Sequence, residues 1–433
     1  MDRRLLNVKK VLIISYFYPP ANFVGGKRPA TWVKYLHESG YYPIVVTRQW
    51  NEGQTDLVDK LYYNKLEVTY YKTHEIHKLP FKRSFRDSCS KYHFLKPIQK
   101  GLTLFELISS NFFIEALPFA NFYHYSKKLI KNDSTISIVI ASGRPFQSYS
   151  IGYQLKKDFP SIRWIPEYRD EWSTHPKYNR KGILNKIIHY MESKSEIKWT
   201  SNSYAFISVS ERLVKNISNK IGKIGISIPN GFEMVNNIPK VVKAEIKEKV
   251  TLSYAGTLYD YQPIERVVNA FKEINNTLEI PVVLEFYGVE MILSVKEKLE
   301  KLISGYEDYF FLHKKVDKKT LLMIQQNSDF LFLTNYTDIN DWLVVKLIDY
   351  SVTGIPVILF PSDNGIMSDF INKTNIGYSL KNENEFYNFF NSIIKIKKIE
   401  KQINKSILEN YSVKKQVEKL SVFLSSDEIL LEM

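Results

Sequence analysis

The chain has 433 residues, too many for one ordinary hydrophobic core, so we expect two domains of similar size. Hydrophobic residues make up 44% of the chain and charged residues 24%, which excludes an intrinsically disordered protein. The formal charge of +14, from 60 Lys and Arg against 46 Asp and Glu, favours anionic partners: phosphorylated ligands, an acidic membrane surface or nucleic acid.

Cysteine usage and hydropathy exclude two further classes. Cys89 is the only cysteine, so the chain forms no internal disulfide, and no cluster of Cys and His has zinc spacing. A reducing compartment fits this composition. Basic residues precede a short apolar run near the N-terminus, but that run ends in Pro19-Pro20, so we interpret it as a strand and not as a signal peptide. No stretch of about 18 residues is apolar and uncharged, which predicts no membrane span.

The first predicted strand covers residues 11–16, an apolar run rich in β-branched side chains. Gly25-Gly26 follows, and residues 27–39 look helical, which gives a strand, a Gly-containing loop and a helix. Backbone N–H groups at such a helix N-terminus attract phosphate, and Arg28 adds a bidentate anion contact. The two glycines lack the spacing of a dinucleotide fingerprint, and a flexible turn is the alternative interpretation.

Further strands are predicted at 44–47 and 66–71, after which residues 78–131 change character. Lys, Arg and His alternate there with Phe, Tyr and Leu, a mixture that suits an anionic membrane surface. The basic residues that we expect to contact lipid are Lys82, Arg83 and Arg86. Nucleic acid accepts the same mixture, but no nucleic-acid motif is present, so we expect no nucleic-acid partner. Amphipathic helices with aromatic core faces and solvated lysines are the plain alternative.

Two predicted strands, 136–141 and 163–168, are each followed by charged residues. In an open parallel sheet, ligands bind beyond the carboxyl ends of the strands, so these residues are candidate acceptor ligands. Two arginines suit an anion, and two acids suit an acceptor hydroxyl, as ligand or as base. The candidates are Arg144, Glu167, Arg169 and Asp170. Salt bridges among the four are the alternative.

Repeated alternation of strands and helices predicts an α/β fold in which right-handed crossovers build parallel sheets. Two more strands complete the first half, at 204–209 and 224–228. The second half repeats the pattern with strands at 251–255, 282–287, 330–333 and 355–360. The expected organisation is an N-terminal domain over 1–232, a linker over 233–249, a C-terminal domain over 250–410 and a final helix over 411–433 that returns to the first domain.

The stretch 340–356 carries three charged residues on a short predicted helix, Asp341, Lys346 and Asp349. Lys346 and Asp349 lie about 60° apart around such a helix, so they share a face and can converge on one ligand. A cation beside a carboxylate suits a phosphate joined to a sugar. The alternatives are a solvated ion pair for these two residues and a helix N-cap for Asp341.

Seven motifs follow one another from residue 11 onwards: VLIISYFYPP with GGKRP, IVIASGRPFQSYSIG, PEYRDEW, FISVSERL, SIPNGFE, LSYAGTLYDYQPI and KLIDYSVTGIPVI. In this order and spacing they resemble a bacterial glycosyltransferase of family 4 with the GT-B fold. The resemblance implies two Rossmann-like parallel-sheet domains facing a central cleft. A nucleotide-sugar donor would be held mainly by the second domain and the acceptor mainly by the first.

The resemblance also assigns roles to residues. Seven residues separate Asp341 from Asp349, which is the spacing of the family's paired acids, so Asp349 would bind the donor ribose. Lys346 would contact the donor diphosphate, and Asp170 and Asp341 are the catalytic candidates. The other donor contacts that it implies are Gly25, Gly26, Arg28, Gly256 and Thr257, with Arg266 as a further phosphate ligand.

The implied activity is transfer of a sugar from a nucleoside diphosphate sugar to a hydroxyl of a polysaccharide or lipid-linked glycan precursor. The resemblance implies that the anomeric configuration is retained. We expect no metal and no other cofactor, because cationic side chains would stabilise the leaving diphosphate. The expected location is the cytoplasm, with peripheral attachment to the inner face of the membrane.

Three departures from the family motivate a second hypothesis. Thr257 and Gln262-Pro263 stand where many members carry Arg and Lys, and Tyr149 stands where many carry His. Both paired acids are Asp where Glu is usual. The alternative is therefore a catalytically inactive GT-B scaffold that binds a glycan or a partner enzyme at the membrane.

Overall fold

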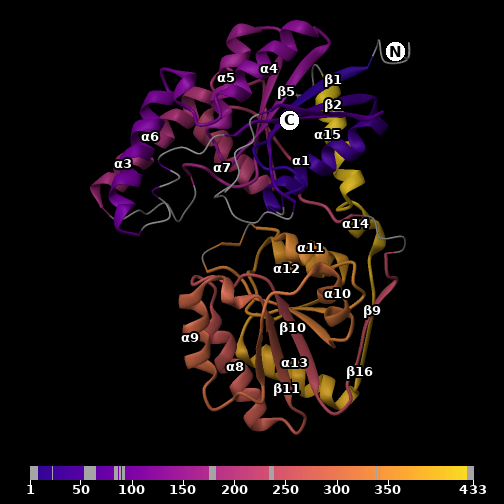
Figure 1. Cartoon of the computed structure of the whole chain (residues 1–433). Helices are drawn as coiled ribbons and strands as arrows, with labels where there is room; N and C mark the ends of the chain where they lie inside the picture. The colour runs from indigo at the N-terminus through magenta and orange to yellow at the C-terminus, as the bar shows by residue number, and fades with distance from the viewer. Residues whose placement is uncertain are drawn as a thin grey trace. The chain divides into compact units, whose positions relative to one another are not determined.

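The computed structural model describes residues 8–21, 23–52, 65–81, 86, 89, 93–174, 182–233, 238–337, 339–340 and 342–426. The chain forms two compact units: unit 1 comprises Met1–Pro229 with Gln416–Met433, and unit 2 comprises Asn230–Lys415. Each unit contains its own parallel sheet with helices packed on it, as Figure 1 shows. The α/β fold with two parallel sheets, predicted from the alternation of strands and helices, is confirmed.

Unit 1 is built on an eight-stranded sheet in the order β3-β4-β2-β1-β5-β6-β7-β8. Its strands are β1 (Lys9–Ile14), β2 (Tyr41–Arg48), β3 (Glu67–Tyr70), β4 (Glu75–Leu79), β5 (Ile136–Ser142), β6 (Arg163–Tyr168), β7 (Phe206–Ser208) and β8 (Gly225–Ser227). All neighbours pair in parallel except β3, which runs antiparallel to β4 at the edge. The central strand β1 is buried on both faces, which explains its unbroken apolar sequence.

The helices of unit 1 cover both faces of this sheet. They are α1 (Val24–Tyr35), α3 (Lys96–Ser110), α4 (Asn121–Asn132), α5 (Ser148–Asp158), α6 (Ile183–Thr200) and α7 (Glu211–Ile221), with 3₁₀ turns η2 (Leu36–Ser39), η3 (His93–Leu95) and η4 (Ile114–Ala116). Helix α7 is capped at its start, because the Ser210 hydroxyl accepts a hydrogen bond from the Leu213 N–H. Gly152 brings α5 close to β6, since a Cβ there would lie 2.3 Å from the Trp164 ring.

Unit 2 is built on a six-stranded sheet in the order β12-β11-β10-β13-β14-β15, all parallel. Its strands are β10 (Val250–Ala255), β11 (Val282–Tyr287), β12 (Phe310–His313), β13 (Phe330–Leu333), β14 (Val357–Leu359) and β15 (Gly377–Ser379), and a separate antiparallel pair joins β9 (Val241–Glu245) to β16 (Lys398–Gln402). Its helices are α8 (Ile264–Thr277), α9 (Leu293–Ile303), α10 (Lys318–Gln326), α11 (Val345–Tyr350), α12 (Ile366–Thr374), α13 (Glu383–Ile396) and α14 (Lys405–Glu409), with the 3₁₀ turn η6 (Val289–Met291).

Two hydrophobic clusters, one on each face of this second sheet, hold unit 2 together. Successive residues of β13 alternate between them: Phe330 and Phe332 join the cluster with α8, α9 and α13, whereas Leu331 and Leu333 join the cluster with α11 and α12. Figure 1 shows α8 and α9 together beside this sheet. A strand buried on both faces needs no polar side, so FLFL has no alternation.

The predicted linker 233–249 is wrong in part, because β9 lies within it and pairs with β16. Val242 and Ala244 are buried while Lys243 and Glu245 are exposed, so the strand pattern was hidden among charged residues. At the C-terminus, α15 (Val413–Ser425) begins in unit 2, and residues from Gln416 onwards cluster with unit 1. There the Arg163 guanidinium donates to the Leu424 carbonyl at 2.6 Å.

Among the helices that the structure describes, none combines the length and the apolar character that a transmembrane segment requires.

Candidate functional site

The structure brings the predicted site residues of unit 1 to one edge of its sheet. The carboxyl ends of β1, β5 and β6 are neighbours there, and each is followed by candidate residues. Those that gather at this edge are Gly25, Gly26 and Arg28 after β1, Arg144 after β5, and Glu167, Arg169 and Asp170 at the end of β6 and after it.

Gly25 and Gly26 lie inside the first turn of α1 and not, as predicted, in the loop before it. Gly26 allows this turn to pack on the preceding loop, because a Cβ there would lie 3.0 Å from the Tyr18 Cα. A Cβ at Gly25 would lie 2.0 Å from the Arg169 Nη1 atom. The tertiary contacts of the glycines therefore outweigh their poor helix propensity.

Arg28 and Glu167 form a buried ion pair at the centre of this edge. Arg28 Nε lies 2.7 Å from Glu167 Oε1, and the side chains are 5% and 0% exposed. The Ser142 hydroxyl donates to the other carboxylate oxygen, Oε2, at 2.6 Å. Glu167 therefore has no surface with which to bind an acceptor, which contradicts its predicted role as an acceptor ligand. Its partner, Arg28, is not one of the four residues among which salt bridges were the alternative.

Arg28 is held on three sides by protein groups. Besides Glu167, its Nη1 donates to the Pro229 carbonyl at 3.2 Å, and its guanidinium lies 4.9 Å from the Trp32 ring centroid. Burial lowers the pKa of Arg28, and the neighbouring carboxylate opposes that shift. Among the described residues, its buried Nη2 atom has no hydrogen-bond partner.

Arg169, Arg144 and Asp170 lie at the more exposed side of the same edge. The Arg169 guanidinium donates to the Gly143 carbonyl at 2.7 Å through Nη2 and at 3.2 Å through Nε. Arg144 Nε lies 3.2 Å from Asp170 Oδ2, and their side chains are 48% and 41% exposed. These three side chains, and not Glu167, are the ones that reach solvent.

In unit 2, Lys346 and Gly256 come together although 90 positions separate them in the sequence. Gly256 ends β10 with φ of +107°, and a Cβ there would lie 3.4 Å from the Lys346 Cε atom. The Lys346 ammonium lies 3.6 Å from the centroid of the Tyr254 ring. Burial lowers the pKa of Lys346 to about 7. Among the described residues, no carboxylate forms an ion pair with Lys346, so the predicted alternative of a solvated pair with Asp349 is wrong.

Helix α11 is anchored so that Lys346 faces the end of β10. The Tyr350 hydroxyl, one turn further along α11, accepts a hydrogen bond from the Ala255 N–H at 3.1 Å. The Tyr254 hydroxyl donates to the Thr257 carbonyl at 3.0 Å, which fixes the turn that follows Gly256. Gly256, Thr257 and Lys346 are thus held together before any ligand binds.

Of the two acids that were predicted to act as a pair, the structure describes only Asp349. Asp349 is exposed on α11, whereas Asp341 lies outside the described residues. Helix α11 begins at Val345 with Val344 as its N-cap, so it is shorter than the predicted helix. Residues 340 and 342–344 are not helical, and the Asn340 carbonyl accepts from the Ile366 N–H at 2.9 Å.

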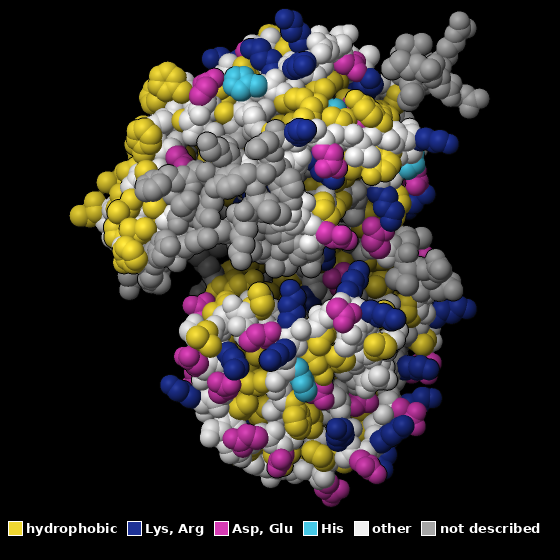
Figure 2. Space-filling view, viewed as in Figure 1, with side chains coloured by type: hydrophobic (Ala, Val, Ile, Leu, Met, Phe, Trp, Pro, Cys, Tyr) yellow, Lys and Arg dark blue, Asp and Glu magenta, His cyan; other side chains and the backbone are white. Residues whose placement is uncertain are grey.

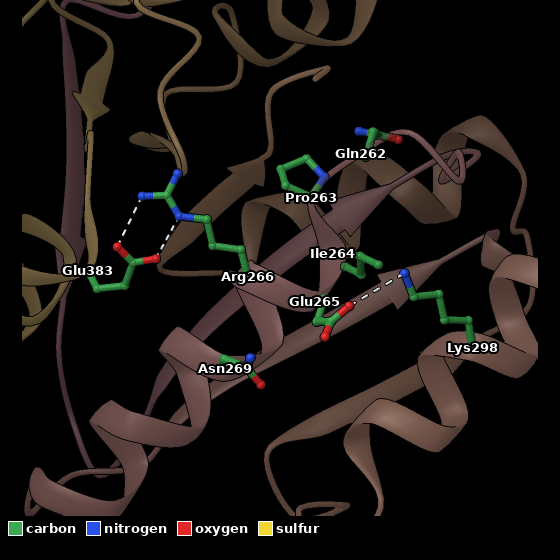
Figure 3. A pocket seen from close by; sticks show the side chains of 8 residues that line it. All are labelled: Gln262, Pro263, Ile264, Glu265, Arg266, Asn269, Lys298 and Glu383. Carbon is green, nitrogen blue, oxygen red and sulfur yellow. Dashed lines mark hydrogen bonds and ion pairs between the residues drawn. The ribbon is translucent and has the colours of Figure 1, made fainter. Parts of the chain in front are cut away.

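Arg266, the further phosphate candidate, lies at a shallow cavity of about 450 Å³ on unit 2. It forms a bidentate pair with Glu383, with Nε–Oε1 at 2.6 Å and Nη2–Oε2 at 3.0 Å. Figure 3 shows this pair on one side of the cavity and Glu265 with Lys298 on the other. The charges that line this cavity are therefore paired with one another.

An aromatic group near Gly256 was not predicted. Tyr259 and Tyr261 stack at 5.2 Å between centroids, Tyr261 lies 5.8 Å from Tyr336, and Tyr336 lies 5.7 Å from Trp342. The signal was present in the sequence LYDYQP directly after Gly256-Thr257. Such rings can stack on a sugar or a base.

Within the described part of the chain, no group of His, Cys, Asp or Glu is arranged to hold a metal ion. Tyr149 is fully buried, and its hydroxyl donates to the Glu167 carbonyl at 2.8 Å. This hydrogen bond helps to fix the carboxyl end of β6.

The two units together have the GT-B fold, with parallel sheets of eight and six strands matching solved GT-B glycosyltransferases over 96% of the chain. The chain is similar to the α,α-trehalose-6-phosphate synthase of Burkholderia multivorans, at 8% identity, 96% coverage of each chain and a TM-score of 0.59. It is also similar to Anabaena HepE, solved with UDP and glucose, at 10% identity, with 96% of this chain and 99% of that one covered and a TM-score of 0.56.

A glycosyltransferase from Rickettsia africae matches at 12% identity over 99% of this chain and 100% of the other, with a TM-score of 0.55. The sequence matches no family model and no curated protein. Identities this low carry the fold alone, so membership of family 4 stays a prediction.

Proposed function

We propose that this protein is a nucleotide-sugar-dependent glycosyltransferase that binds its donor in unit 2. The observation that carries the proposal is the Lys346 ammonium, held over the open end of β10 beside Gly256 and paired with no described carboxylate. An ammonium group in this position can form an ion pair with an anionic ligand, and a diphosphate is such a ligand. The fold is one that solved complexes with UDP share, which supports the same assignment.

In the proposed reaction, the bond between the anomeric carbon and the diphosphate breaks, and the acceptor oxygen bonds to that carbon. The proton of the acceptor hydroxyl passes to a base, for which Asp170 is the candidate. Negative charge grows on the leaving diphosphate, and Lys346 stabilises it there. The exposed Asp349 on α11 would bind the donor ribose, and retention of the anomeric configuration follows from the sequence resemblance. No metal is required in this scheme, because the cationic side chain provides the charge stabilisation.

We propose that unit 1 binds the acceptor through the exposed groups at its sheet edge. Asp170 is the candidate for an acceptor-hydroxyl ligand or base, and Arg144 and Arg169 are candidates for an acceptor anion. A polysaccharide or lipid-linked glycan precursor offers both a hydroxyl and a phosphate. Such precursors are assembled at the inner face of the cytoplasmic membrane, which is the location that we propose.

The test is a thermal-shift screen of UDP, GDP, ADP and their sugars against the wild type, Lys346→Ala and Lys373→Ala. Lys373 is the matched control, because it is an exposed lysine of the same unit, paired with Asp369. A ligand at 100 times its Kd stabilises the folded state by about 2.7 kcal/mol, so one nucleotide should raise the Tm of the wild type and of the control. Lys346→Ala should lose that rise; an unchanged rise would remove Lys346 from the donor site.

One observation favours the inactive scaffold as a second candidate. Gln262, which stands at a position where many relatives carry a cation, accepts from the Tyr259 N–H at 2.9 Å and so holds its own loop. A scaffold would neither bind a nucleotide saturably nor hydrolyse any donor. Donor hydrolysis across the same panel therefore separates the two candidates.

A further inference from the structure

Helices α3 and α6 of unit 1 carry an apolar surface that the proposed glycosyl transfer does not use. Of the 22 large hydrophobic side chains that are exposed in the described part of the chain, ten lie on these helices or within three residues of their ends. They include the three most exposed of all, Ile183 at 80%, Phe94 at 77% and Phe112 at 74%. Figure 2 shows hydrophobic side chains gathered where Figure 1 places α3 and α6. We call the exposed apolar side chains of residues 94–113 and 183–197 the α3/α6 surface.

On α3, the exposed apolar side chains lie on the face opposite to the one that packs. Ile98 and Phe105 are seven residues apart and so lie about 20° from one another around the helix axis. The buried residues Leu107 and Ser110 lie about 200° and 140° around the axis from Phe105. The apolar ridge of α3 is therefore additional to its core face.

The same arrangement recurs on α6. Ile183, Tyr190 and Ile197 fall within about 40° of one another around the axis, and all three are exposed. The buried side chains Ile188 and Trp199 lie about 140° and 160° away from Ile183. A surface helix ordinarily places polar residues on this outer face, so two helices with apolar outer faces indicate a binding surface.

Contacts between the helices make the two ridges parts of one surface. The Asn111 amide at the end of α3 donates to the Ser195 hydroxyl of α6 at 2.6 Å. The Lys198 ammonium donates to the Asn111 carbonyl and lies 5.5 Å from the Phe112 ring centroid. Exposed Phe112 thus sits where α3 meets α6.

The sequence of the two segments that carry this surface is rich in Lys and Arg. Residues 82–113 and 175–200 contain twelve Lys and Arg against four Asp and Glu. Lys100 and Lys194 are exposed on the two helices, and Lys194 Nζ lies 5.5 Å from the Tyr190 ring centroid. Arg86, by contrast, is paired with Glu106 at 2.5 Å, so its charge is already neutralised. Lys82 and Arg83 lie outside the described residues.

We propose that the α3/α6 surface docks on a bilayer that contains anionic lipids. Its Phe and Ile side chains enter the acyl boundary, while lysines such as Lys100 and Lys194 reach the lipid phosphates. A second copy of the chain fits the same surface poorly, because docking two such surfaces would bring exposed lysines of both copies, such as Lys100 and Lys194, together. The docking surface extends the membrane contact predicted for 78–131 to α6, which the sequence did not implicate, and it does not depend on glycosyl transfer.

The experiment is flotation of the full chain with vesicles of equal phosphatidylglycerol and phosphatidylcholine, and with vesicles of phosphatidylcholine alone. The wild type should float with the mixed vesicles and far less with the neutral ones. The double variant Phe105→Ser with Ile183→Ser, called the serine pair below, should weaken partitioning about tenfold or more, because each substitution removes exposed apolar area from the docking surface. Lys100→Ala and Lys194→Ala should each weaken it about fivefold.

Matched controls keep the result specific. Leu293→Ser and Ile396→Ser remove side chains of unit 2 that are 65% and 66% exposed, close to the 67% of Phe105, and should leave flotation unchanged. If the serine pair impairs folding, as circular dichroism would reveal, the lysine variants provide the test. The proposal is overturned if the wild type does not float, or if the serine pair floats as well as the wild type. It is also overturned if light scattering reveals a dimer in the wild type and a monomer in the serine pair, because the surface would then bind a second copy.

Discussion

The carboxyl ends of the two sheets differ in how their charges are satisfied. In unit 1 the buried Arg28 and Glu167 pair with one another, and Arg144 pairs with Asp170. In unit 2 the Lys346 ammonium lies on the Tyr254 ring and pairs with no described carboxylate. Two sheet ends of the same kind thus hold their cations in opposite states before a ligand binds.

This difference distinguishes charged groups that stabilise the fold, such as Arg28 and Glu167, from a charged group that is placed to bind a ligand, such as Lys346. A buried ion pair fixes the loops around it, and removing one partner leaves an uncompensated charge. A half-buried lysine without an acid holds its charge poorly, which its pKa of about 7 reflects, and it gains most from an incoming anion. We therefore expect unit 1 variants to change stability and unit 2 variants to change donor affinity.

The largest expected effect is on the stability of unit 1. Glu167→Ala leaves the buried Arg28 charge without its carboxylate, so the free energy of unfolding should fall by about 3–5 kcal/mol. Urea denaturation followed by circular dichroism measures this loss. The double variant Arg28→Met with Glu167→Met removes both charges and should recover most of the stability; a double variant as unstable as Glu167→Ala would contradict the ion-pair explanation.

The next effect tests the open end of β10 in unit 2. Gly256→Ala places a Cβ at φ of +107° and 3.4 Å from the Lys346 Cε atom, so it should cost about 1–3 kcal/mol of stability and weaken donor binding. Gly305→Ala is the matched control, since Gly305 has φ of +80° and nothing within 4 Å of an added Cβ. It should cost similar stability without changing donor affinity, measured by calorimetry. Equal losses of affinity in both variants would mean that backbone strain alone is responsible.

The pH dependence of donor binding sharpens the role of Lys346. With a pKa of about 7 in the free protein, Lys346 is charged below that pH and neutral above it. A bound diphosphate favours the ammonium, so binding above about pH 7 takes up a proton, and the Kd should rise about tenfold for each pH unit. Lys346→Arg keeps its charge throughout and should bind with a flat profile between about pH 6 and about pH 9. A flat wild-type profile would exclude contact between Lys346 and the diphosphate.

The sequence predicted those elements that local pattern determines. Strands β10, β11 and β13 are apolar runs because they are buried on both faces, and they were placed within one residue. Strands β9 and β16 were missed, since one face of each bears Lys and Glu. The start of α1 was displaced by three residues, because close packing and not propensity decides where Gly25 and Gly26 lie.

Local sequence pattern could not predict which of the site residues form ion pairs with one another. Arg28 and Glu167 are 139 positions apart, and only the adjacency of β1, β5 and β6 makes them a pair. The sequence named Lys346 and Gly256 separately, yet their approach depends on the hydrogen bond from the Ala255 N–H to the Tyr350 hydroxyl. Sequence thus indicated which residues gather at each sheet edge, and tertiary packing decided which of them are already paired.

The smallest expected effect concerns the exposed pair of unit 1. Arg144→Ala breaks an ion pair whose side chains are 48% and 41% exposed, so it should reduce the free energy of unfolding by less than about 1 kcal/mol. If Asp170 binds the acceptor hydroxyl, freeing it from Arg144 should change the KM for the acceptor while the Kd of the donor stays constant. Lys127→Ala is the control, because it breaks a comparable surface pair with Asp158 at 3.0 Å, away from the ends of β5 and β6. A change in donor affinity with Arg144→Ala would break the division between the two units, since it would give an acceptor-side residue a role in donor binding.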